Sequence, residues 1–147
     1  MPKILILYYS RTGNTEKMAN AIAEGARTTG NVEVDVEFHV DADDLNKYDA
    51  ILIGTSTYYH DMPMDSKRLF EEAAMKRVNL KDKTGAAFGS YGWSGEAPKL
   101  VLEIMKNKFE MHITEPPLLA LNTPDQNSLN QCRELGKRVS ETLIHKA

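Results

Sequence analysis

Segments typical of strands alternate with segments typical of helices along this chain, and the alternation limits the folds that it can adopt. The apolar run of residues 3–9 (KILILYY) is typical of a strand that is covered on both faces. The other strands are expected within residues 32–40, 48–54, 84–90 and 110–121. The helices are expected within residues 13–30, 64–77, 96–108 and from 123 onward. Because strands joined by helices form parallel sheets through right-handed crossovers, the sequence predicts an α/β fold, a doubly wound five-stranded parallel sheet in one domain, 1–147.

Residue patterns within these segments predict where each one lies. Apolar and polar residues alternate strictly in residues 32–40, which is typical of a strand with one wet face at the edge of a sheet. The small residues within 84–90 indicate close packing at the centre of the sheet. The last helix is expected to start at Thr123 and Pro124, and Cys132 on its apolar stripe is expected in the core.

Composition excludes several classes of function. The formal net charge is −3, with 18 basic and 21 acidic residues, so the basic stripe of a nucleic-acid binder is not expected. The apolar runs are too short to cross a membrane, and the first residues do not resemble a signal peptide. A single cysteine cannot form an internal disulfide, and the four histidines lack the spacing of metal ligands. We therefore expect a cytoplasmic protein without a metal site.

The loop of residues 10–15, Ser-Arg-Thr-Gly-Asn-Thr, has the chemistry of a phosphate site. It follows a buried strand and opens into a helix, whose first N–H groups and dipole favour an anion. The hydroxyls of Ser10, Thr12 and Thr15 can donate to phosphate oxygens. Such residues also serve as plain N-caps, which is the alternative interpretation. Neither a Walker loop nor a dinucleotide fingerprint is present, so the pattern favours the phosphate of a mononucleotide.

Two further loops carry aromatic residues at the expected strand tips. Residues 55–63 contain Tyr58 and Tyr59, and residues 90–96 contain the single tryptophan, Trp93. Rings at these places can stack on a flat conjugated ligand, or they can simply close the end of the core. Since open α/β sheets bind ligands at the carboxyl ends of their strands, the three loops together predict one ligand site.

With these loops the chain resembles the flavodoxin family. The pattern Ser10-x-Thr12-Gly13-x-Thr15 is similar to the family's phosphate loop, and residues 56–61 and 90–96 are similar to its two flavin-ring loops. The resemblance covers the whole chain and is to the short-chain type. It implies a flavodoxin-like sheet in the order 2-1-3-4-5, with FMN held non-covalently at the tips of the strands.

A closer resemblance is to the flavodoxin-like module of A-type flavoproteins. It rests on residues 16–19, residues 90–97 and the pair Pro116-Pro117. A-type flavoproteins join this module to a diiron domain that reduces oxygen or nitric oxide, and that domain has no counterpart in this sequence. The resemblance therefore implies an electron carrier that works with protein redox partners, without nucleic acid or membrane.

The resemblance also implies which residues contact FMN. They are Ser10, Arg11, Thr12, Gly13, Asn14 and Thr15 at the phosphate, Ser56, Thr57, Tyr58, Tyr59 and His60 in the second loop, and Ser90, Tyr91, Gly92, Trp93 and Gly95 in the third. Tyr58 and Tyr59 are candidates for one face of the ring, and Tyr91 or Trp93 for the other. None of these residues is expected to act as a chemical catalyst, because the flavin carries the electrons.

One departure from the family concerns the second loop. The usual flavodoxin has a glycine there whose peptide can flip when the flavin is reduced, whereas residues 59–62 contain none. A positive φ costs more at a residue with a Cβ atom, so we expect less of the one-electron-reduced flavin than in a typical flavodoxin.

Two other functions are compatible with the same fold. The chain could be an FMN-dependent NAD(P)H:quinone or flavin reductase, although such enzymes usually carry longer inserts. It could also be a flavin-storage or partner-binding domain without a redox role. Reduction by NADPH distinguishes the first alternative, and a flavin that cannot be reduced reversibly would favour the second.

Overall fold

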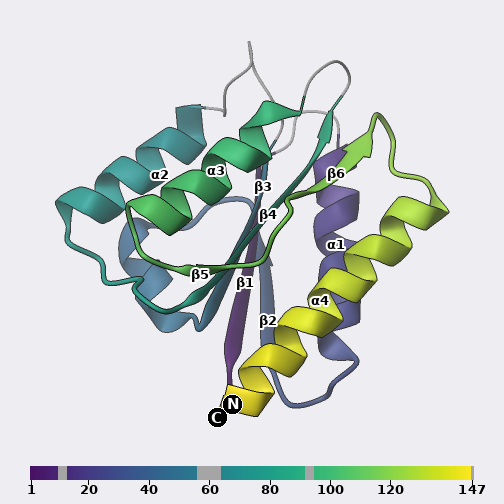
Figure 1. Ribbon diagram of the computed structural model, residues 1–147, viewed down its shortest axis with the longest axis horizontal. Coiled ribbons are helices and arrows are strands. Elements are labelled where there is room, and N and C mark those ends of the chain that lie inside the picture. Colours follow the sequence, from purple (N-terminus) through teal and green to yellow (C-terminus); the bar gives the residue numbers. More distant parts are fainter. Residues whose placement is uncertain (10–12, 56–63, 92–94, 147) are drawn as a thin grey trace.

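A parallel sheet crosses the molecule, with helices on both of its faces (Figure 1). The computed structural model describes residues 1–9, 13–55, 64–91 and 95–146. The strands of the main path stand in the order β2-β1-β3-β4-β5. Their bounds in chain order are β1 (Lys3–Tyr9), β2 (Glu33–Glu37), β3 (Ala50–Thr55), β4 (Thr84–Tyr91) and β5 (His112–Ile113). The doubly wound sheet and the order 2-1-3-4-5 are thereby confirmed, with β2 at the edge as its alternating pattern predicted.

The fifth position of the sheet is divided between two short strands. β5 pairs with the first residues of β4, and β6 (Leu118–Leu121) pairs with its last residues, both in parallel. The sequence predicted one strand within 110–121. Pro116 and Pro117 lie between the two pieces and have no N–H to donate, so they interrupt the ladder.

The helices form one layer on each face of the sheet. α1 (Asn14–Arg27) and α4 (Gln126–Lys146) cover one face. The other face is covered by η1 (Ala42–Lys47), α2 (Met64–Met75) and α3 (Glu96–Asn107). Alternate residues of β1 enter the two cores, since Ile4 and Ile6 pack under α1 and α4 while Leu5 and Leu7 face the other layer. This two-sided burial explains the unbroken apolar run of the first strand.

The start of α4 differs from the expectation by a few residues. The helix begins at Gln126, and Asp125 caps it by accepting a hydrogen bond from the Ser128 N–H at 2.8 Å. The prediction that Thr123 and Pro124 start the helix was therefore wrong in detail. A side-chain cap satisfies a first-turn N–H group, which a proline ring cannot do.

α1 and α4 pack very closely because each helix places a glycine against the backbone of the other. A Cβ atom on Gly25 would lie 1.9 Å from the carbonyl oxygen of Arg133, and one on Gly136 would lie 1.9 Å from that of Ile22. The buried Ser140 hydroxyl donates a hydrogen bond of 2.8 Å to the backbone of α1 close by. Neither glycine can be replaced without moving the helices apart.

Cys132 lies in the core beneath these helices, as its place on the apolar stripe predicted. Burial raises the pKa of its thiol to about 12. Because only the thiolate is nucleophilic, the folded protein is expected to resist alkylating reagents at pH 8. Labelling followed by mass spectrometry should show no adduct in buffer and one adduct in denaturant. Fast labelling in buffer would contradict the burial.

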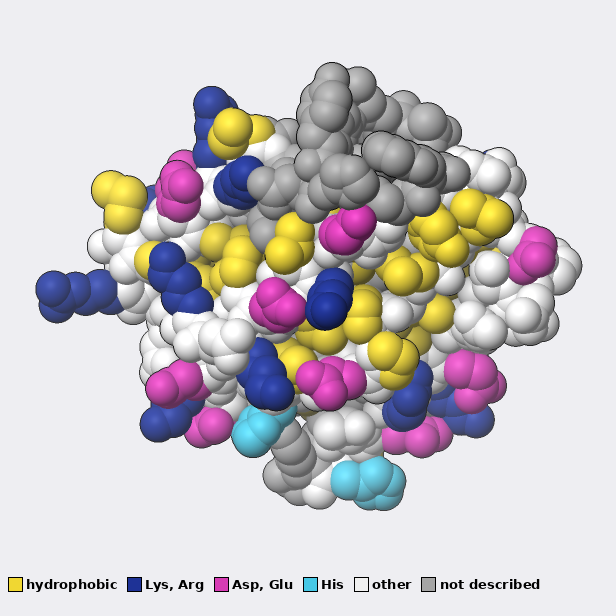
Figure 2. All heavy atoms as spheres, turned by 45° about the horizontal axis from the view of Figure 1, so that its top comes forward, with side chains coloured by type: hydrophobic (Ala, Val, Ile, Leu, Met, Phe, Trp, Pro, Cys, Tyr) yellow, Lys and Arg dark blue, Asp and Glu magenta, His cyan; other side chains and the backbone are white. Residues whose placement is uncertain are grey.

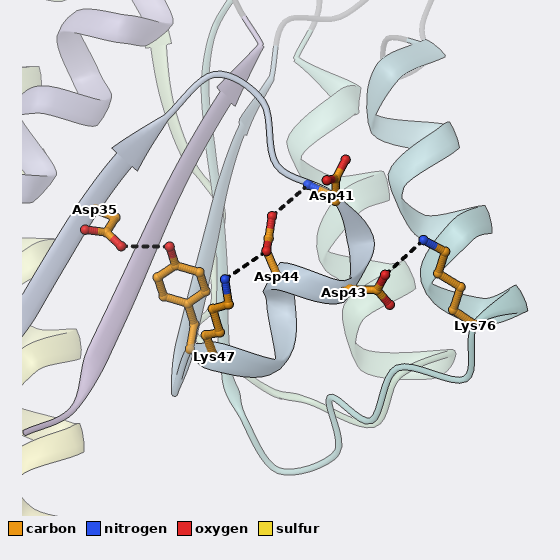
Figure 3. A network of polar contacts seen from close by, with 7 residues as sticks. Asp35, Asp41, Asp43, Asp44, Lys47 and Lys76 are labelled. Carbon is orange, nitrogen blue, oxygen red and sulfur yellow. Dashed lines mark hydrogen bonds and ion pairs between the residues drawn. The ribbon is translucent and has the colours of Figure 1, made fainter.

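Hydrogen bonds and ion pairs tie the edge strand and η1 to their neighbours (Figure 3). The Tyr48 hydroxyl donates to Asp35 on β2 at 2.7 Å. Nearby, Lys76, the residue directly after α2, pairs with Asp43 at 3.1 Å, and both side chains are well exposed. The burial of Tyr48 and its contact with Asp35 raise the pKa of the phenol.

The Tyr48→Phe variant is expected to lose about 1 kcal/mol of stability at pH 7, since it removes a hydrogen bond to a charged group that water can partly replace. Because the pKa of Tyr48 is higher in the folded protein, its stabilising contribution is complete below pH 10 and falls above it. Urea unfolding at pH 7 and pH 10.5 measures both effects. The control Lys76→Ala removes the exposed pair with Asp43 and should cost about 0.5 kcal/mol or less. A larger loss in Lys76→Ala than in Tyr48→Phe would contradict this ranking.

Both ends of the described chain lie at the amino end of the sheet. β1 starts there, and α4 runs back against the strands to finish at the same lower end of Figure 1. Within the described ranges, no helix combines the length and the hydropathy that a membrane span requires.

Candidate functional site

The three predicted loops leave the sheet at one edge, because parallel strands end on the same side. β1, β3 and β4 end at Tyr9, Thr55 and Tyr91, along the upper edge in Figure 1. Most of the predicted contact residues lie outside the described residues: Ser10, Arg11, Thr12, Ser56, Thr57, Tyr58, Tyr59, His60, Gly92 and Trp93. The described ones are Gly13, Asn14, Thr15, Ser90, Tyr91 and Gly95, and they belong to the first and third loops.

At the first loop, α1 begins on a glycine in a left-handed conformation. Gly13 is the N-cap, with φ +85°, and as a glycine it has no side chain with which to cap the helix. A Cβ atom on Gly13 would meet no atom of the described residues within 4 Å, so none of them crowds the helix start. Asn14 and Thr15 lie inside the first turn, so the N-cap alternative does not apply to them. A helix N-terminus of this kind is suited to an anion.

Thr15 connects the first predicted loop to the third. Its side chain is buried, and its hydroxyl oxygen accepts a hydrogen bond of 3.4 Å from the Ser90 N–H at the end of β4. A hydroxyl that accepts one hydrogen bond can still donate another. The structure therefore brings together two segments that are 75 residues apart in sequence.

Two glycines let the helices approach this end of the sheet. A Cβ atom on Gly54 would lie 2.2 Å from the Phe88 ring and 2.8 Å from the Thr15 methyl group. One on Gly89 would lie 2.1 Å from the Thr55 carbonyl oxygen and 3.0 Å from a Pro98 ring carbon. The prediction of close packing around the small residues of β4 is confirmed. As a result, the starts of α1 and α3 both lie close against the sheet.

Apolar residues lie together where β4 ends and α3 begins. A Cβ atom on Gly95 would contact Leu119 at 3.2 Å and the Tyr91 ring at 3.5 Å, so these residues lie together at the start of α3. In the ladder, Tyr91 is paired with Leu121. Leu119 is 37% exposed and Leu121 is 58% exposed, which leaves apolar surface open beside the site.

Sequence reasoning missed the segment that follows β6. Asn122 has a positive φ of 55°, and its N–H donates to the Tyr91 carbonyl oxygen at 2.6 Å. Its own carbonyl oxygen accepts a hydrogen bond from the Ser90 hydroxyl. An asparagine directly after an apolar strand and just before Thr-Pro is a signal for a left-handed turn, and it could have been used.

The Tyr8 phenol lies beside a carboxylate near the first loop. Burial and the carboxylate of Glu16 raise the pKa of Tyr8, which lies on β1. Glu16 itself stands in the first turn of α1. The shift makes ionisation of Tyr8, already absent at neutral pH, still less favourable.

A hollow lies away from this edge, between α2 and α3. It measures about 540 Å³, and hydrophobic side chains gather over this face in Figure 2. Apolar and charged side chains both line it: Lys67, Phe70, Glu71, Leu100, Glu103, Ile104, Asn107 and Lys108. In the part of the chain that the structure describes, no group of three or more histidine, cysteine or acidic residues could hold a metal ion.

Comparison with known proteins identifies this arrangement. A family model described as flavodoxin matches residues 6–136. The chain belongs to the flavodoxin family. A solved flavodoxin from the domain Archaea is 39% identical, and the match covers 97% of this chain and 99% of that one with a TM-score of 0.88.

The curated relatives include longer proteins. A type A flavoprotein of Rhodobacter capsulatus is 33% identical over 98% of this chain, and an anaerobic nitric oxide reductase flavorubredoxin of Escherichia coli is 36% identical over 94%. The match covers only 34% and 29% of these two relatives, so the chain spans about a third of their length. The resemblance to the flavodoxin-like module of A-type flavoproteins is confirmed.

FMN is the cofactor of this family and of this chain. The described residues fit it on two counts. The start of α1 at Gly13 offers the helix N-terminus that suits an anion, and no described residue crowds the Cβ position of Gly13. The end of β4, with Tyr91 and the close contact at Gly95, provides a surface for a flat ring.

Proposed function

We propose that this protein carries electrons on FMN between protein redox partners, as a single domain of residues 1–147. The observation that supports this most strongly is the end-to-end match with the archaeal flavodoxin, which covers 97% of this chain and 99% of that one. A match over nearly the full length of both chains supports the same kind of role for this domain. Bound FMN supplies the electron chemistry, because its ring accepts and releases electrons. The chain supplies binding, orientation and access.

The phosphate is held by the first loop in this proposal. The contacts come from Ser10, Arg11, Thr12, Gly13, Asn14 and Thr15. Support comes from the glycine N-cap, whose Cβ position no described residue crowds, and from the positive end of the α1 dipole. The Thr15 hydroxyl can donate to the phosphate while it accepts from Ser90.

The ring is held by the second and third loops. The proposed contacts are Ser56, Thr57, Tyr58, Tyr59, His60, Ser90, Tyr91, Gly92, Trp93 and Gly95. Tyr91 and Gly95 are supported by their place beside the start of α3. The exposed Leu119 and Leu121 would then border the cofactor, where an apolar patch on a redox partner could cover them.

Anaerobic reduction of the FMN-loaded protein tests the proposal. NADPH is added first and dithionite second, while the visible absorbance of the flavin is followed. An electron carrier should not respond to NADPH, should bleach completely with dithionite and should recover in air. Fast bleaching by NADPH alone would instead make the protein a reductase. Failure of the purified apoprotein to bind FMN would overturn the proposed site.

A further inference from the structure

Three hydrogen bonds join three separate segments at the cofactor edge. The Ser90 N–H donates to the Thr15 hydroxyl at 3.4 Å, and the Ser90 hydroxyl donates to the Asn122 carbonyl oxygen. The Asn122 N–H donates to the Tyr91 carbonyl oxygen at 2.6 Å. The end of β4 is therefore fastened on one side to the start of α1 and on the other side to the turn after β6.

The turn after β6 is itself fixed at both of its ends. Leu121 closes the ladder opposite Tyr91, and α4 starts at Gln126 with Asp125 as its cap. Between them, Asn122 adopts a φ of +55°. This left-handed conformation lets both backbone groups of Asn122 reach the end of β4, and asparagine tolerates it better than most residues.

The same contacts hold the Ser90 side chain in a fixed position. Its side chain is only 9% exposed, and its hydroxyl hydrogen is used in the bond to the Asn122 carbonyl oxygen. The hydroxyl oxygen can still accept a hydrogen bond from the ring, so Ser90 stays among the proposed ring contacts. The bond to Asn122 in addition fixes Ser90 at the end of β4.

We propose that Asn122 is a positioning residue of the flavin site, which holds Ser90 and Tyr91 so that the third loop can receive the ring. This inference rests on the proposed function, because the ring contacts of residues 90–95 belong to it. Asn122 lies beyond the three loops and acts through β4. A substitution of Asn122 should therefore weaken the binding of the flavin ring and leave the binding of the phosphate unchanged.

A comparison of two flavins separates the binding of the ring from the binding of the phosphate. FMN and riboflavin share the ring, but only FMN has the phosphate. The dissociation constants of both are measured by quenching of flavin fluorescence on titration with apoprotein, and the visible spectrum of each bound flavin is recorded. A substitution that weakens only the binding of the ring raises the dissociation constants of FMN and riboflavin by the same factor.

The Asn122→Val variant puts a β-branched residue at φ +55°, where it is strongly disfavoured. Both dissociation constants are expected to rise about tenfold, with a shifted visible band. The Asn122→Gly variant keeps the conformation and should bind both flavins within about twofold of the natural protein. If Asn122→Val does not fold, Asn122→Ala serves instead, because it imposes a milder form of the same strain at φ +55°, and it should raise both constants by the same, smaller factor.

The matched control is Glu110→Val. Glu110 has the same φ of 55°, but it lies before β5 at the other end of the sheet. It should lower the melting temperature about as much as Asn122→Val and leave both dissociation constants unchanged. Equal constants in Asn122→Val, Asn122→Ala and the natural protein would overturn the positioning role, as would a loss of FMN affinity alone. A natural protein that binds neither flavin would overturn the proposed function instead.

Discussion

The Gly136→Ala variant is expected to unfold with a free energy about 3 kcal/mol lower than that of the natural protein. The added methyl carbon would lie 1.9 Å from the Ile22 carbonyl oxygen and 2.8 Å from the Ala26 nitrogen. Both neighbours are backbone atoms, so no change of side-chain rotamer can relieve the overlap. α1 and α4 have to separate, and the core beneath them loses its close packing.

Urea unfolding and thermal melting of the apoprotein measure this loss, which corresponds to a fall in melting temperature of roughly 10 °C. Lys137→Ala is the control, because it adds no atoms at the next, exposed position of the same helix. Gly25→Ala should cost about as much as Gly136→Ala. The double variant should lose less than the sum, since one separation of the helices relieves both contacts. A Gly136→Ala variant as stable as Lys137→Ala would contradict the close crossing.

The Gly13→Val variant is expected to bind FMN at least about tenfold more weakly, while riboflavin affinity changes much less. The added Cβ atom would meet no described residue within 4 Å, so the main effect is expected from the φ of +85° that valine disfavours. The start of α1 then shifts, and with it the N–H groups that face the proposed phosphate. Riboflavin has no phosphate and does not depend on them.

Gly30→Val is the matched control at the other end of α1. Gly30 has a φ of +80° and equally open surroundings, so the strain and the loss of stability, about 1–2 kcal/mol, should be the same. FMN affinity should stay unchanged, because Gly30 lies at the amino end of the sheet. Equal flavin affinities in the two valine variants would show that the phosphate lies elsewhere. Fluorescence titration with FMN and riboflavin provides the measurement for both.

Local patterns in the sequence predicted the sheet well. A strand that is buried on both faces has a continuous apolar run, whereas a strand that is buried on one face alternates apolar and polar residues. The run at β1 and the alternation at β2 are examples, and both strands lie where those patterns placed them. The interruption between β5 and β6 was also readable, since Pro116 and Pro117 cannot donate to a ladder. The prediction nevertheless assigned one strand to the whole segment 110–121.

Features that depend on distant partners were not predictable in this way. In the sequence, Gly25 and Gly136 look like ordinary helical glycines. Only the close crossing of α1 with α4 explains why no larger residue fits at these positions. The contact between Thr15 and Ser90 joins positions 75 residues apart. Asn122 was overlooked because the search for a site followed the ends of β1, β3 and β4, whereas this residue follows the divided fifth position.

The position of the two chain ends has a practical consequence. β1 starts and α4 finishes at the amino end of the sheet, opposite the edge where the strands end. A tag or a surface linker at either end would therefore leave the cofactor edge pointing outward. Immobilised on a gold electrode through such a linker, the molecules would form an oriented film whose far side stays open to soluble partners, and the current they pass would depend on the thickness of the protein layer.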